Sequence, residues 1–117
     1  MKFIRTIITI SILALYFTTQ AIAAGVNQHT IEAIKHAETA QIHGEAGHTK
    51  ALLDHTQESL THAKAAGNEL DKAHQQHMTE SIKHLDEAIA HAKQDHADVA
   101  TKHVIEALKH MRESAAK

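Results

Sequence analysis

Apolar residues after position 27 recur every three or four positions, the spacing that lines one face of an α-helix. Proline is absent from the chain, and helix-favouring Ala, Glu, Lys, Leu and Gln dominate this part of it. The pattern predicts four helices, at roughly residues 28–43, 48–66, 69–92 and 96–114. The apolar stripe is clearest in the third helix, where it consists of Met78, Ile82, Leu85, Ile89 and Ala92.

The other three predicted helices carry less regular stripes. These consist of Ala97, Thr101, Val104, Ile105, Leu108 and Met111 in the fourth helix, Leu52, Leu53, Leu60 and Ala63 in the second, and Ile31, Ile34 and Ala37 in the first. We expect these residues to form one shared core.

The chain contains an internal repeat, because a shift of 48 residues superimposes segment 27–66 on segment 75–114, histidines included. In each segment two groups of histidines keep a seven-residue spacing but are separated by five residues. This break in phase predicts turns at 44–47 and 92–95. The expected fold class is therefore all-α: an antiparallel up-down four-helix bundle made of two duplicated helical hairpins.

The linker between the hairpins has its own signals. Gly67 is expected to end the second helix in the left-handed conformation. Asn68 is expected to cap the third helix, with Asp71 in its first turn.

Residues 1–24 have the pattern of a secretory signal peptide: two basic residues, an apolar stretch at 7–17, and small residues that suit cleavage after Ala23 or Ala24. The alternative, an uncleaved membrane anchor, is disfavoured because the stretch is shorter than the ~20 residues of a spanning helix. We expect a periplasmic domain at 25–117 that has no membrane contact after cleavage.

Removal of this segment changes the composition. Every aromatic residue leaves with it, so the core of the domain must be aliphatic, and the absence of cysteine excludes disulfides and lipid attachment. Ten basic residues then remain against 14 acidic ones, a formal charge of −4 with neutral histidines. This balance disfavours nucleic acid as a partner and suits cations.

Thirteen histidines are the main chemical feature, and all but His74 form four triplets with a seven-residue spacing. Neutral imidazole is a good ligand for borderline divalent metals, but histidines seven apart on one helix are roughly 10 Å apart, too far to share an ion. Glutamates recur three residues after one histidine and four before the next, on the same helix face. The predicted two-ligand clamps are Glu32–His36, Glu58–His62, Glu80–His84, Glu87–His91 and Glu106–His110.

The densest run of potential ligands is in the third helix. His74 and His77 are the one pair of histidines three or four residues apart, so they form the first predicted site. The run consists of Asp71, His74, His77, Glu80 and His84.

A second kind of site is expected at the hairpin tips, where two triplets end close together. The tips hold His43 with His48, and His91 with His96 beside Asp95. Sites with four ligands need histidines from two helices or from two molecules. The complete set of candidate metal ligands is His29, Glu32, His36, His43, His48, His55, Glu58, His62, Asp71, His74, His77, Glu80, His84, Glu87, His91, Asp95, His96, His103, Glu106 and His110.

The ligand types constrain the metal. Thiolates are absent, and Met78 and Met111 belong to the predicted core. Imidazole with carboxylate suits Cu(II), Ni(II) and Zn(II), and the Irving–Williams order places Cu(II) tightest. Exposed sites of two or three ligands predict a permissive buffer of several divalent ions, chiefly Cu(II), with a role in metal homeostasis or detoxification. We expect a monomer, with metal-bridged oligomers as the alternative.

An enzymatic function is disfavoured, because the sequence has no Gly-rich phosphate loop, no distinctive nucleophile and no C-x-x-C-H haem motif. A di-iron bundle needs inward-facing Glu-x-x-His pairs, whereas this chain has Glu-x-x-x-His pairs facing away from the core. The competing interpretation is a structural or interaction bundle whose histidines form a pH switch, because most would be charged below about pH 6.

Several segments resemble the small metal-binding protein (SmbP) family. They are IKHAE at 34–38, EAGHTKALLDHTQESLTHAKAA at 45–66, IKHLDEAI at 82–89 and ATKHVIEALKHMR at 100–112. The resemblance spans the domain and implies a periplasmic helical bundle that binds several divalent ions through its heptad histidines. It also implies copper as the physiological metal and a role in copper storage or homeostasis. The first helix is less regular at Ala40 and Gln41, and the resemblance does not extend to His74.

Overall fold

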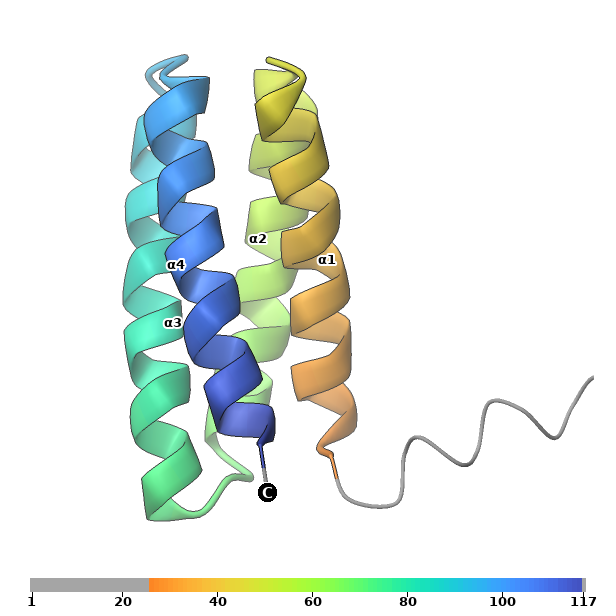
Figure 1. Cartoon of the computed structure of the whole chain (residues 1–117), viewed down its shortest axis with the longest axis vertical. Coiled ribbons are helices and arrows are strands. Elements are labelled where there is room, and N and C mark those ends of the chain that lie inside the picture. The colour runs from red at the N-terminus through yellow and green to blue at the C-terminus, as the bar shows by residue number, and fades with distance from the viewer. Residues whose placement is uncertain (1–25, 117) are drawn as a thin grey trace, which may run out of the picture.

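The computed structural model describes residues 26–116, which form four α-helices (Figure 1). The helices are α1 (Gln28–Glu45), α2 (Thr49–Gly67), α3 (Lys72–Ala92) and α4 (Ala97–Ala115). Each end lies within three residues of its predicted position. The predicted signal peptide at 1–24 lies outside the described residues. None of the described helices is long and apolar enough to cross a membrane.

The four helices run alternately up and down (Figure 1). α1 packs mainly on α2 and α3 mainly on α4, while contacts of α1 with α4 and of α2 with α3 join the two pairs. The α1–α2 and α3–α4 turns share one end of the bundle, and the α2–α3 loop lies at the other end with the C-terminus (Figure 1). The predicted antiparallel up-down four-helix bundle is confirmed.

Small side chains line the contact faces of the helices. In α1 the buried positions are Thr30, Ala33, Ala37, Ala40 and Gly44. Larger side chains come mostly from the other helices: the biggest fully buried ones are Leu52, Met78, Leu85, Val104, Leu108 and Met111. The core is aliphatic, as predicted, but alanine contributes more to it than the apolar stripes indicate.

Several residues of the predicted stripes lie at the edge of the core. Ile34, Leu53, Leu60 and Ile82 are only partly buried, and Ile105 is 41% exposed. The inward positions nearby belong to residues such as Ser81, Ala88 and Ala107. Helices that meet through alanine and serine leave little room for a large side chain on the contact line, so the larger side chains lie beside it.

Two contacts show how closely the helices approach one another. The Ser59 hydroxyl donates a hydrogen bond of 2.7 Å to the main-chain carbonyl of Ala33, across the α1–α2 hairpin. A Cβ added to Gly44 would overlap the side chain of Thr101 on α4. Gly44 was predicted to lie in the first turn, but α1 continues through it to Glu45. This close approach brings side chains on the flank of a hairpin within reach of each other.

The two hairpin turns share one geometry. Gly47 and Asp95 occupy corresponding positions of the repeat, and both have a positive φ, of 74° and 61°. In each turn the N–H of the next histidine donates a hydrogen bond to the carbonyl of the histidine five residues earlier, at 2.8 Å in the first turn and 3.0 Å in the second. The left-handed residue lets the chain reverse its direction between the two helices of each hairpin.

The α2–α3 linker differs from the prediction. Gly67 is the last residue of α2 and does not adopt a positive φ. The N-cap of α3 is Asp71 rather than Asn68, because its carboxylate accepts hydrogen bonds from the N–H groups of Ala73 and His74 at 3.0 Å and 3.1 Å.

Candidate metal centres

The first hairpin brings the two histidine triplets of α1 and α2 face to face. His29 lies opposite His62, His36 opposite His55, and His43 opposite His48, with ring centroids 5.5, 5.7 and 5.8 Å apart. We call these six residues the first ladder and each facing pair a rung. The pairing follows from the five-residue break in phase, because in an antiparallel hairpin each step of seven along α1 is matched by a step of seven back along α2.

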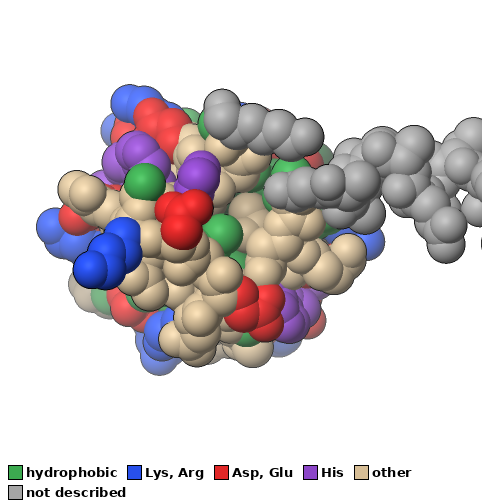
Figure 2. All heavy atoms as spheres, turned by 90° about the horizontal axis from the view of Figure 1, so that it is seen from below, with side chains coloured by type: hydrophobic (Ala, Val, Ile, Leu, Met, Phe, Trp, Pro, Cys, Tyr) green, Lys and Arg blue, Asp and Glu red, His purple; other side chains and the backbone are tan. Residues whose placement is uncertain are grey.

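The second hairpin repeats this arrangement between α3 and α4. The three rungs of this second ladder have ring centroids 6.1, 5.7 and 6.0 Å apart. They are His77 with His110, His84 with His103, and His91 with His96. Seen along the bundle axis, histidine side chains gather in two separate places on opposite sides of the molecule, each beside acidic side chains (Figure 2).

Each ladder is continuous along its hairpin, because rings of neighbouring rungs also stack. In the first ladder His36 stacks on His62 and His43 on His55, at 5.7 and 5.5 Å and with nearly parallel planes. The equivalent distances in the second ladder are 5.7 and 5.4 Å. His36, for example, lies against His55 of its own rung and against His62 of the neighbouring rung. It can therefore share an ion with either of these histidines.

The nitrogen atoms of a rung have the separation that a shared ion requires. The Nδ1 atoms are 3.2 Å apart in the His29–His62 rung, 3.4 Å in the His36–His55 rung and 3.4 Å in the rung formed by His84 and His103. Two imidazole nitrogens bound to one tetrahedral ion at 2.0–2.1 Å are about 3.3 Å apart. The rungs thus fit a divalent ion with little movement of the rings.

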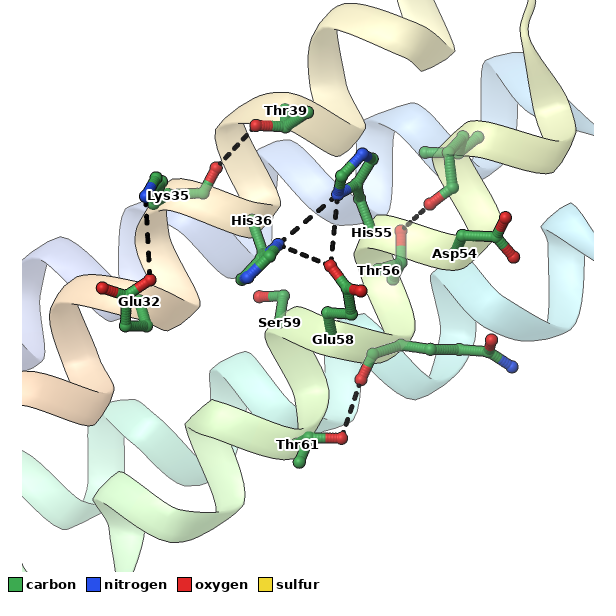
Figure 3. Close-up of polar contacts among 12 residues, drawn as sticks. Glu32, Lys35, His36, Thr39, Asp54, His55, Thr56, Glu58, Ser59 and Thr61 are labelled. Atoms are coloured by element: carbon green, nitrogen blue, oxygen red, sulfur yellow. Dashed lines mark hydrogen bonds and ion pairs between the residues drawn. The ribbon is translucent and has the colours of Figure 1, made fainter.

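A carboxylate completes the His36–His55 rung (Figure 3). Glu58 Oε2 lies 2.8 Å from His36 Nδ1 and 3.4 Å from His55 Nδ1, so that three ligand atoms form a compact triangle. Its residues come from α1 and α2 and point toward one another (Figure 3). The His36 side chain is 24% exposed, so the triangle is accessible to solvent.

Two further triangles lie on the second ladder. Glu87 Oε2 is 3.4 Å from His84 Nδ1 and 3.0 Å from His103 Nδ1. Glu113 Oε2 is 3.0 Å from His77 Nδ1 and 3.1 Å from His110 Nδ1. In each of the three triangles the ligand atoms all lie within 4.8 Å of one another.

Glu113 was missed by the sequence analysis. It follows His110 by three residues, as Glu58 follows His55 and Glu87 follows His84. The predicted clamps required a histidine four residues after the glutamate, and no histidine follows Glu113. The spacing that identifies Glu113 is a glutamate three residues after a histidine.

None of the five predicted intrahelical clamps is formed among the described residues, so this prediction is wrong. Glu32 pairs with Lys35 and accepts a hydrogen bond from Gln28, while Glu58 and Glu87 contact the histidine three residues before them. Side chains on a helix lean toward its N-terminus, so Glu58 and Glu87 reach back to the preceding histidine and away from the following one. Glu80 and Glu106 form no ion pair with any described residue.

The densest predicted run is divided between different contacts. His74 Nδ1 lies 2.8 Å from Asp71 Oδ2 and its Nε2 lies 3.0 Å from the carbonyl oxygen of Ala116, whereas His77 faces Glu113 on α4. The structure therefore does not bring His74 and His77 together. As metal ligands, Asp71 and His74 stay a prediction.

The contacts of His74 shift two pKa values. Hydrogen bonds from the backbone and side chain of His74 lower the pKa of Asp71. The hydrogen bond with Asp71, followed by that to the Ala116 carbonyl, raises the pKa of His74. Both effects favour the charged pair, which links the start of α3 to the C-terminal end of the chain.

The two histidines of each hairpin tip lie side by side, as predicted, but Asp95 does not join its pair. His43 lies against His48, and His91 lies against His96, with rings 5.8 and 6.0 Å apart. Asp95 is exposed in the second turn and forms no ion pair with a described residue. The tips therefore offer two imidazoles each, and the Nδ1 atom of His91 is buried without a hydrogen-bond partner.

Comparison with known proteins agrees with this geometry. No curated protein matches the chain. The family model described as small metal-binding protein matches residues 1–114, nearly the whole sequence. With the paired imidazoles and carboxylates, this match shows that the chain belongs to the small metal-binding protein family.

Proposed function

We propose that the protein buffers or sequesters several divalent metal ions, chiefly Cu(II), in the periplasm. The observation that carries the proposal is the set of rungs, in which imidazole nitrogens from two helices lie 3.2–3.4 Å apart, three rungs being joined by a carboxylate. Metal homeostasis or detoxification is the corresponding role. The periplasmic part of the proposal rests on the signal-peptide pattern at 1–24.

The rungs limit the number of ions that can be shared between two helices. A ring nitrogen that binds an ion in one rung is not available to the neighbouring diagonal pair. Each ladder therefore holds at most three such shared ions, one in each rung. The rungs with Glu58, Glu87 or Glu113 offer three ligands and should bind more tightly than the hairpin tips, which offer two.

Cu(II) is the metal that this ligand set favours. Neutral imidazole and carboxylate bind Cu(II), Ni(II) and Zn(II), and a site without a rigid geometric filter follows the Irving–Williams order. The ligands lie on the flanks of the bundle and are partly exposed, as for His84 with 23% of its side chain accessible. Ions in solvent can reach such sites directly, which suits buffering better than catalysis.

Titration of the purified protein with Cu(II) at about pH 7.5, where imidazole is neutral, tests the proposal by native mass spectrometry. We expect several bound ions. Binding of one ion or none would contradict the buffer and favour a structural bundle with a histidine pH switch. A matched titration of the Asp86→Asn variant, which alters an exposed residue of α3 that is not a candidate ligand, should give the same number of ions as the unaltered protein.

A further inference from the structure

We infer that the two ladders differ in coordination. Two rungs of the α3–α4 hairpin take a divalent ion with two histidines and two carboxylates, whereas no rung of the α1–α2 hairpin offers more than one carboxylate. The additional ligands are Glu80 and Glu106. The inference rests on the proposed metal binding and concerns which hairpin holds ions more tightly.

The three observed triangles obey one spacing rule. Glu58, Glu87 and Glu113 each follow a histidine of their rung by three residues on the same helix, and each lies within 3.4 Å of it. The N-terminal lean of helical side chains explains why this position reaches the rung. A glutamate at the same position of the facing helix would approach the rung from the other side, because the helices are antiparallel.

The α3–α4 hairpin has glutamate at this position on both helices, in two rungs. In the His84–His103 rung, Glu87 follows His84 and Glu106 follows His103. Glu106 is exposed and forms no ion pair or side-chain hydrogen bond with a described residue, so its side chain can turn toward the rung without losing a contact.

The rung formed by His77 and His110 has the same pair of carboxylates. Glu113 follows His110 and already contacts both rings, while Glu80 follows His77. Glu80 is exposed and, like Glu106, has no ion-pair partner among the described residues. Both rungs therefore have two nitrogen and two oxygen ligands available.

In the α1–α2 hairpin the corresponding positions supply a single carboxylate. Opposite Glu58 the position is occupied by Thr39, whose hydroxyl donates a 3.0 Å hydrogen bond to the Lys35 carbonyl. In the rung at the other end, Glu32 follows His29, but Ala65 stands where a second glutamate would be. The two hairpins, otherwise alike in their histidines, differ at these positions.

The difference in ligands has two chemical consequences. Two carboxylates neutralise a divalent ion, whereas one leaves a net positive charge in the site. Four protein ligands also complete a tetrahedral Zn(II) site or the equatorial plane of Cu(II), whereas three leave a position for water or an incoming ligand. The α3–α4 hairpin should therefore fill first and retain its ions, and the α1–α2 hairpin should exchange them.

The test is a titration of the full protein with Zn(II) alone, followed by NMR of the histidine side chains. In the unaltered protein, signals of His84 and His103 should respond before those of His36 and His55. Replacing Glu80→Gln and Glu106→Gln together should weaken the tightest binding about tenfold or more, the scale on which even outer partners of metal ligands matter, and remove the order of filling. Conversely, Thr39→Glu with Ala65→Glu should strengthen the α1–α2 hairpin.

The control is Asp86→Asn, which removes one negative charge, as each single glutamate replacement does, from an exposed position of α3 that lies off the ladder face. It should leave the order of filling intact. Simultaneous filling of the two hairpins in the unaltered protein, or an equal effect of Asp86→Asn and the glutamate replacements, would overturn the inference while leaving the proposed metal binding in place. Failure of the protein to bind Zn(II) or Cu(II) at all would instead overturn the proposed function.

Discussion

His36 on α1 and His55 on α2 face each other across the first hairpin with their Nδ1 atoms 3.4 Å apart. Neither histidine has another ring within reach on its own helix, since the next one along is seven residues away. The antiparallel turn supplies the second ligand, and the Glu58 carboxylate lies against both rings. The relation between the two helices, and not the stripe on either of them, creates the candidate site.

Replacing both histidines of this rung should remove one ion from the protein. With His36→Gln and His55→Gln, the rungs on either side remain, so the first ladder should hold at most two ions instead of three. Native mass spectrometry with saturating Cu(II) measures the change. The Asp86→Asn variant is the control, and a double variant that keeps the full number of ions would show that this rung does not bind one.

Metal binding should stabilise the bundle, because each rung joins two helices. An ion that binds only the folded state adds about 2.7 kcal/mol of unfolding free energy when its free concentration is a hundred times its dissociation constant. Thermal unfolding with and without Cu(II) should show a higher midpoint with the metal, reversed by a chelator. An unchanged midpoint at saturating metal would mean that the unfolded chain binds the ions as tightly as the folded bundle does, which would contradict binding in preformed rungs.

The fold could be predicted from the sequence because local and global signals agree. The stripe from Met78 to Ala92, the lack of proline and the break in histidine phase all specify helices and turns at the same places. The identity of the core was harder to predict. Ser59 and Ala33 form the close contact of the first hairpin, and polar or small residues of this kind are not recognised by a search for large apolar ones.

The candidate ligands could be predicted as residue types, but their grouping could not. The sequence analysis grouped His36 with Glu32 on the same helix, whereas the hairpin turn places His36 opposite His55 on the next helix. The direction in which Glu58 and Glu87 reach depends on the lean of side chains along a helix. Sequence spacing allows each glutamate to contact either the histidine three residues before it or the histidine four residues after it. Only the geometry of the side chains distinguishes these two contacts.

The second hairpin turn offers a way to stabilise the fold. Asp95 has a φ of 61°, a conformation that glycine adopts without the cost of a Cβ, and Gly47 occupies the equivalent position of the first turn. Asp95→Gly should raise the unfolding free energy by about 0.5 kcal/mol, and Gly47→Ala should lower it by about 1 kcal/mol. Urea denaturation of the metal-free proteins measures both. A loss of stability in Asp95→Gly would mean that its side chain contributes more than the strain costs.

The Asp71–His74 pair predicts a specific pH dependence. The pKa of His74 is raised, so its contribution to stability is fully present below its unfolded pKa and is lost as pH rises through the folded pKa. The pKa of Asp71 is lowered, so its contribution is lost as pH falls through that value. NMR titration of metal-free protein should show a raised His74 pKa that falls in Asp71→Asn. Asp86→Asn should leave it unchanged, and an unaffected pKa in Asp71→Asn would contradict the assignment.

Anomalous diffraction from crystals of the Zn(II)-loaded protein tests most directly whether ions bind between helices. We expect ions between facing histidines in both hairpins, with one between His36 and His55 that also contacts Glu58. Ions bound only by one helix, as in a Glu32–His36 clamp, or only at contacts between molecules, would contradict it.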